Sequence, residues 1–94
     1  MGRKSLAEKI FDEIDEDPEE PYTWLVVYDF TESKPSTRFW ENLQRVAYLA
    51  GEGSLVQYSV FMTPSRRGAI TAQRLVEHYK GEAMVFRGEE VETR

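Results

Sequence analysis

The feature that most constrains the fold is an unbroken apolar run, WLVVYDF at residues 24–30, which stops at a carboxylate. A Val-rich run of this length predicts a central β-strand covered on both faces, because a half-exposed strand would alternate apolar and polar residues. Side chains alternate across a strand, so Asp29 shares its face with Leu25 and Val27. Asp29 therefore ends an apolar row and is the first candidate functional residue.

The net charge of -5 is concentrated at the start of the chain. Residues 1–20 hold eight acidic and three basic side chains, whereas residues 21–94 hold nine of each. The net negative charge thus comes from residues 1–20, which we call the leader. It does not exclude a local basic surface on the rest of the chain.

Length and composition indicate one small soluble domain. A chain of 94 residues has room for a single core and would gain by burying more surface against a partner. The chain has no cysteine, which excludes a disulfide framework and a thiolate metal site. It also lacks the apolar core of a signal peptide and any run of about 18 apolar residues. We expect a cytoplasmic protein with no membrane segment.

Residues 1–21 are predicted to form an amphipathic helix followed by an acidic linker. Ser5 and Glu8 have capping-box spacing. The helical apolar stripe consists of Leu6, Ile10, Phe11 and Ile14. Residues 12–20 then hold seven acidic side chains, and prolines break any continuation of the helix. This linker is either a solvated tether or a docking arm that mimics nucleic acid and covers a basic surface.

Residues 22–94 alternate between strand and helix patterns. Residues 36–50 show one continuous apolar helical face that ends at Gly51. Residues 54–62 read as strand, with a possible break near Ser59 into a hairpin, and a second helix runs from Ser65 to Gly81. Residues 83–87 form an apolar strand, and residues 89–93 form a short polar strand or tail.

This order predicts an α+β fold of the ferredoxin-like βαββαβ type with an antiparallel sheet, preceded by the N-terminal helical extension. Right-handed crossovers would place both helices of residues 22–94 on one side of the sheet. The other side would be bare. We expect it to carry Leu25 and Val27 together with Leu55 and Phe61, and to be buried in a symmetric homodimer. Two copies of Asp29 would then approach each other across the axis.

Two motifs carry a resemblance to a known family. The strand end LVVYD at residues 25–29, a following helix that contains arginine, and VQYSVF at residues 56–61 together resemble the CRISPR-associated protein 2 family. The similarity covers about residues 22–92 and leaves the leader unmatched. The virulence-associated D toxins, which are ribonucleases, are related to that family by fold.

The resemblance implies a homodimer in which Asp29 is the candidate catalytic and metal-binding residue, with Mg²⁺ or Mn²⁺ as the ion. The supporting residues in the matched motifs are Tyr28, Ser59 and Phe61. The implied partners are a CRISPR integrase subunit and DNA or RNA. Members of the family are metal-dependent endonucleases or non-catalytic scaffolds for DNA. Because Mg²⁺ prefers six oxygen ligands, one carboxylate per subunit favours the scaffold.

The candidate nucleic-acid-binding residues are Lys34, Arg38, Arg45, Arg66 and Arg67. Arg38 is the clearest match to the arginines of the family, and it could meet Asp29 near the end of the first strand. Arg66 and Arg67 lie at a helix start whose free amides could take a phosphate. We expect the set to gather toward one end of the fold.

Three functions remain open at this point. The chain is a DNA-binding scaffold of spacer acquisition, a toxin-like endoribonuclease, or a non-catalytic regulatory module that shares the fold.

Overall fold

The computed structural model describes residues 4–17, 22–31, 34–57, 59–89 and 91–92. Its elements are α1 (Leu6–Glu13), β1 (Thr23–Asp29), α2 (Thr37–Leu49), β2 (Ser54–Gln57), β3 (Val60–Thr63), α3 (Arg66–His78) and β4 (Glu82–Gly88). The α+β class and the break between two strands near Ser59 are confirmed. Of the predicted terminal strand, Glu89, Val91 and Glu92 are not in a strand, and positions 90 and 93 lie outside the described residues.

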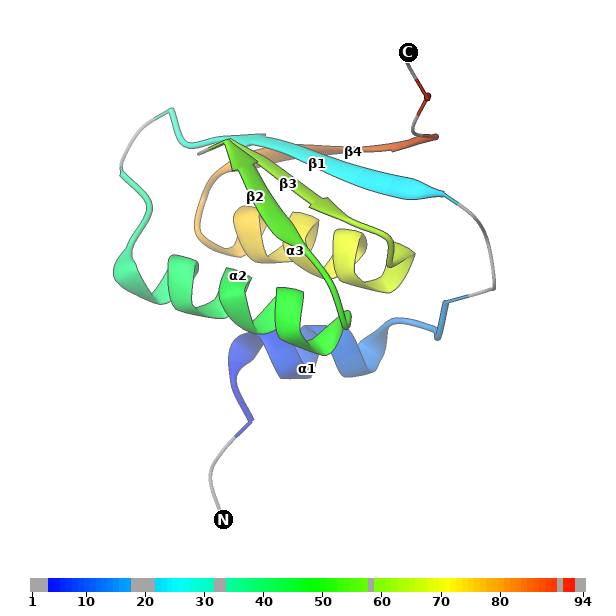
Figure 1. Cartoon of the computed structure of the whole chain (residues 1–94). Helices are drawn as coiled ribbons and strands as arrows, with labels where there is room; N and C mark the ends of the chain where they lie inside the picture. Colours follow the sequence, from blue (N-terminus) through cyan, green and yellow to red (C-terminus); the bar gives the residue numbers. More distant parts are fainter. Residues whose placement is uncertain (1–3, 18–21, 32–33, 58, 90, 93–94) are drawn as a thin grey trace.

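The four strands form one antiparallel sheet in the order β2-β3-β1-β4. β1 lies in the middle and pairs with both β3 and β4. Since each neighbouring pair is antiparallel, β1 runs parallel to β2 with β3 between them, and β3 runs parallel to β4 with β1 between them. All three helices lie on one side of this sheet (Figure 1). In the part of the chain that is described, no helix is long and apolar enough to cross a membrane.

Each helix begins at a serine that caps it. The side chains of Ser5, Ser36 and Ser65 accept a hydrogen bond from the backbone N–H three residues later. Such a cap satisfies an amide that has no partner inside the helix, and it contributes roughly 0.5–2 kcal/mol. The predicted helix starts follow from these caps.

The ends of α2 and α3 differ in the residue that adopts the left-handed conformation. After α2 it is Gly51, with φ of 81°, as expected from the sequence. After α3 it is Lys80, with φ of 71°, one residue before the glycine that was expected to stop the helix. Lys80 N–H donates to the Glu77 carbonyl, and Gly81 N–H donates to the Val76 carbonyl at 2.9 Å. These two bonds close the helix as a Schellman motif.

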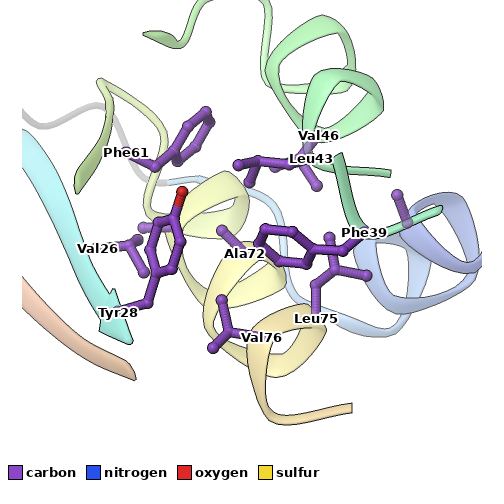
Figure 2. Close-up of a cluster of buried hydrophobic side chains, with 11 residues drawn as sticks. Val26, Tyr28, Phe39, Leu43, Val46, Phe61, Ala72, Leu75 and Val76 are labelled. Atoms are coloured by element: carbon purple, nitrogen blue, oxygen red, sulfur yellow. The ribbon is translucent and has the colours of Figure 1, made fainter. Parts of the chain in front are cut away.

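The core lies between the sheet and the helices and is centred on Phe39 of α2 (Figure 2). Phe39 is fully buried. Its ring makes edge-to-face contacts with Tyr28 at 5.7 Å, Phe30 at 4.9 Å, Trp40 at 5.0 Å and Tyr79 at 5.9 Å between centroids. This one side chain therefore joins α2 to the end of β1 and to the end of α3.

The predicted N-terminal helix, α1, packs against both α2 and α3. Ala7 is fully buried, and its N–H donates to Asn42 Oδ1 of α2 at 2.9 Å. Leu6 and Ile10 pack against the same core as the sheet residues. Residues 18–21, where the leader was expected to join the body, lie outside the described residues.

The face of the sheet away from the helices is open and apolar, but its members differ from those expected. Leu25 and Val27 lie on it as predicted. Phe61, however, is paired with the buried Val26 and is 2% exposed, so it faces the helices. Leu55 is opposite Phe61 and shares that side. The alternation of residues 54–62 correctly indicated that Leu55 and Phe61 share a face of the sheet. It did not indicate that this is the face covered by the helices.

The open face instead takes its other apolar residues from β3 and β4. In β3, Val60 is opposite Val27 and Met62 is opposite Leu25. In β4, Met84 is opposite Val27 and Phe86 is opposite Leu25. We call this set of six, Leu25, Val27, Val60, Met62, Met84 and Phe86, the open-face patch. Met84 is 60% exposed and Phe86 is 49% exposed.

Candidate functional site

Asp29 is the last residue of β1 and is exposed on the open side of the sheet. In the register between β1 and β4 it lies directly opposite Glu82. Opposed residues of an antiparallel pair project from the same face with Cβ atoms roughly 4.5–5.5 Å apart. Two carboxylates therefore stand side by side at this corner of the sheet, next to the open-face patch. We call them the Asp29–Glu82 pair.

Sequence analysis missed Glu82. The signal that identifies it is the pairing of the two apolar rows, Leu25 with Phe86 and Val27 with Met84, which continues to the Asp29–Glu82 pair. That register is a long-range property and cannot be seen in either strand alone.

The Asp29–Glu82 pair is compatible with a weak divalent cation site. Among the described residues no group of three or more His, Cys, Asp or Glu side chains is placed to hold a metal ion. Mg²⁺ is commonly bound by one or two carboxylates, with water or phosphate oxygens completing its six ligands. Two like charges directly opposite each other also disfavour the sheet, and a cation would relieve that repulsion. The donor set is of a kind that the expected ion takes, because two carboxylates per chain rather than one would be available to it.

The supporting residues of the matched motifs lie behind this corner. The Tyr28 ring points into the core, toward the side that holds Phe61 (Figure 2). Burial raises the pKa of the Tyr28 hydroxyl to about 12, and among the described residues this hydroxyl has no hydrogen-bond partner. Ser59 is exposed in the hairpin, and its carbonyl accepts from Tyr28 N–H at 2.9 Å. Tyr28 and Phe61 thus turn toward the helices, and the Ser59 carbonyl holds the end of β1 through Tyr28.

At Gly81, between α3 and β4, the backbone passes close to the end of β1. A Cβ at this position would lie 2.9 Å from the Asp29 carbonyl oxygen and 2.7 Å from Val76 Cγ1. Only glycine lets the chain leave α3 so close to the end of β1. Gly81 thereby brings Glu82 into line with Asp29.

The basic candidates do not gather at one end of the fold. Lys34 and Arg38 lie around the start of α2, at the same end of the sheet as Asp29. Arg66 and Arg67 lie at the start of α3, at the opposite end (Figure 1). The reason is the hairpin: β3 runs antiparallel to β1 and ends opposite Trp24, so the chain enters α3 at the far end. The expected clustering is therefore wrong.

Asp29 and Arg38 do not meet as expected. No ion pair joins them within the described ranges. Arg38 lines a hollow on the helix side together with Ser5, Asn42 and Tyr79, while Asp29 faces the open side. Arg38 and Asp29 therefore line different hollows of the surface.

Two of the five basic candidates are already engaged by α1. Arg45 pairs with Glu8 at 2.9 Å. Arg67 Nε donates to the Phe11 carbonyl at 2.8 Å, and its guanidinium lies 3.9 Å from the centroid of the Phe11 ring. Lys34, Arg38 and Arg66 are exposed.

The start of α3, where free amides were expected, is occupied by a carboxylate from the acidic segment. Asp17 Oδ1 accepts from Arg67 N–H at 2.6 Å, and Asp17 Oδ2 accepts from Ser65 Oγ at 2.5 Å. The next amide, that of Gly68, donates to Ser65 Oγ at 2.9 Å. In the described part of the acidic segment, Asp12, Glu13 and Asp17 contact the body of the protein, since Asp12 lies 4.0 Å from Arg67 and Glu13 lies 3.7 Å from Arg74.

No protein-family model, curated protein or solved structure matches this chain.

Proposed function

We propose that this chain is a homodimeric nucleic-acid-binding scaffold with a ferredoxin-like fold, acting in the cytoplasm in the manner of the CRISPR-associated protein 2 family. The ferredoxin-like assignment is supported by two interleaved units, β1-α2-β2 and β3-α3-β4. In the sheet, β3 lies between the two strands of the first unit, and β1 lies between the two strands of the second. The partners of this scaffold are a second copy of the chain, an integrase subunit, and DNA or RNA.

The observation that carries the proposal is the open-face patch. Three helices cover one side of the sheet, while large apolar side chains such as Met84 and Phe86 remain exposed on the other. A contiguous apolar surface of this kind on a small domain marks an interaction site, and a self-complementary contact buries it on both copies at once. The dimer would carry two sets of the exposed basic residues Lys34, Arg38 and Arg66 and place each Asp29–Glu82 pair beside the shared face.

Replacing Arg38 by alanine is expected to weaken binding to duplex DNA and to lower the steepness of its salt dependence. Each phosphate contact that is lost reduces the slope of log affinity against log salt concentration by about 1. Fluorescence anisotropy with a labelled duplex and with single-stranded RNA, over a series of salt concentrations, measures both quantities. Lys9→Ala, which removes an exposed positive charge from α1, is the matched control. Absence of binding to either nucleic acid at low salt would contradict the proposed function.

A second candidate function, metal-dependent endonuclease activity, is favoured by the Asp29–Glu82 pair. These two carboxylates would hold Mg²⁺ or Mn²⁺ while water and substrate phosphate oxygens complete its coordination. When bound, such an ion polarises a phosphoryl oxygen and makes a bound water more acidic. The chain's own contribution is to keep the two carboxylates in register, through β1, β4 and the close approach at Gly81.

Asp29→Asn is expected to abolish any cleavage of RNA or duplex DNA while leaving the dimer intact, because it removes one of the two anionic ligands. Glu82→Gln should have the same effect, and Glu77→Gln on the exposed surface of α3 should have none. Cleavage is followed on gels with Mg²⁺, Mn²⁺ or EDTA. Cleavage that persists in Asp29→Asn, or in EDTA, assigns the activity to other residues. A wild-type protein that binds without cleaving is the scaffold.

A further inference from the structure

We propose that the acidic N-terminal segment is an autoinhibitory strap: Asp17 occupies the start of α3, and nucleic acid must displace its carboxylate to reach that end of the protein. The proposal rests on the proposed nucleic-acid-binding function and adds a regulation to it. It concerns the end of the molecule that carries Arg66 and Arg67, far from the Asp29–Glu82 pair.

The first support is the geometry of Asp17. Its two oxygens each accept one hydrogen bond, from Ser65 Oγ and from Arg67 N–H, across 48 and 50 positions of sequence. A phosphate group presents pairs of anionic oxygens at similar spacing, and a helix start favours either anion through its N–H groups and its dipole. The carboxylate therefore takes the donors that a phosphate would use.

The second support is the position of the Arg67 side chain. Only 19% of it is exposed, because it lies against the Phe11 ring and donates to the Phe11 carbonyl. Its Nη2 atom is also 4.0 Å from Asp12 Oδ1. Both the backbone amide and the guanidinium of Arg67 are thus held by the same N-terminal segment.

The third support is the charge pattern along the segment. Beyond Asp12 and Asp17, Glu8 pairs with Arg45 at 2.9 Å and Glu13 pairs with Arg74 at 3.7 Å. Four acidic residues of the first 17 thus face arginines on α2 and α3. The N-terminal segment therefore presents several negative charges to these helices, as a nucleic-acid backbone would.

The strap can be released without unfolding α1. The helix ends at Glu13, and Ile14 beyond it is 7% exposed, whereas Asp17 lies three residues further on and is exposed. Of the two hydrogen bonds to Asp17, the one from Arg67 N–H is exposed and the one from Ser65 Oγ is part-buried. Exposed ion pairs are individually weak, so a polyanion that offers several phosphates competes with such contacts. Ala7 and Ile14 belong to the buried interior, so deletion of residues 1–20 would disturb folding. Point variants give the cleaner test.

The test compares Asp17→Ala with Asp15→Ala in the full-length chain. Both variants remove one exposed carboxylate from the same segment, but only Asp17 is hydrogen-bonded to α3. Fluorescence anisotropy with a labelled DNA duplex should show affinity raised roughly 3- to 10-fold for Asp17→Ala at low ionic strength, with the advantage shrinking toward physiological salt. Asp15→Ala should stay within about twofold of wild type.

A second readout does not depend on nucleic acid. Tripolyphosphate is titrated into the ¹⁵N-labelled proteins, and the amide resonances of Arg67 and Gly68 are followed by NMR. These resonances should shift in Asp17→Ala and stay in place in the wild-type protein.

The outcomes separate the strap from the function on which it rests. Equal DNA affinities for the two variants, or weaker binding by Asp17→Ala, overturn the strap and leave Asp17 as a structural cap of α3. Unchanged Arg67 and Gly68 resonances in Asp17→Ala overturn it as well. If tripolyphosphate binds Asp17→Ala at Arg67 while neither DNA nor RNA binds any form, the proposed function fails and the occluding contact stands.

Discussion

Replacing Phe39 by alanine is expected to lower the free energy of unfolding by about 3–5 kcal/mol. The side chain is fully buried, and its ring contacts four other aromatic rings from β1, α2 and the end of α3. Truncation would remove these contacts and leave a cavity that the surrounding rings cannot fill. Since small domains have a total stability of about 5–15 kcal/mol, much of the native stability would be lost.

Urea denaturation followed by circular dichroism measures this effect. Tyr48→Ala is the control on the same helix, because Tyr48 is 73% exposed, and it should change the stability by less than about 0.5–1 kcal/mol. A loss of under about 1 kcal/mol for Phe39→Ala would mean that Phe39 is not at the centre of the core.

Phe86→Glu is expected to convert a dimer into a monomer. Wild-type protein should sediment at about twice the chain mass of 11.0 kDa at micromolar concentration. Phe86 lies in the open-face patch, opposite Leu25, so a glutamate there would place an unpaired charge in the apolar contact. Burying an unpaired charge is strongly unfavourable, and we expect the dissociation constant to rise roughly 100-fold or more.

Tyr48→Glu is the matched control for self-association. It introduces the same acidic side chain at a more exposed aromatic position, on α2 rather than on the open face. Sedimentation velocity of the two variants and the wild type distinguishes a contact through the open face from one through the helices. A wild-type monomer, or a Phe86→Glu dimer, would remove the open-face patch as the basis of the homodimer.

The candidate site was only half visible in the sequence. Asp29 could be found because it ends an apolar run, which is a local pattern. Glu82 could not, because a lone glutamate before a strand has no distinguishing local feature. Its importance comes from the register of β4 on β1, which the packing of both strands against the helices determines.

The basic residues illustrate the same limit. The serine caps that precede α2 and α3 showed that four of the five candidates, Lys34, Arg38, Arg66 and Arg67, lie near the starts of two helices. Their separation could not be read from the sequence, since it depends on the direction in which β3 runs relative to β1. Likewise, the seven acidic residues at positions 12–20 were evident in the sequence. The contacts of Asp17 with Ser65 and Arg67 were not, because these residues lie 48 and 50 positions further along the chain.

The sequence by itself determined the order of helices and strands, the helix starts and the central strand, but it left open whether residues 54–62 form one strand or two. The features that it determined depend on side-chain periodicity and on hydrogen bonds within three or four residues, which act over short stretches of chain. Only the tertiary structure decided that Phe61 faces the helices, that Glu82 stands beside Asp29, and that the acidic segment covers the start of α3. Each of these depends on which distant segments pack together, because burial of apolar surface against the helices selects one face of each strand and one register between strands.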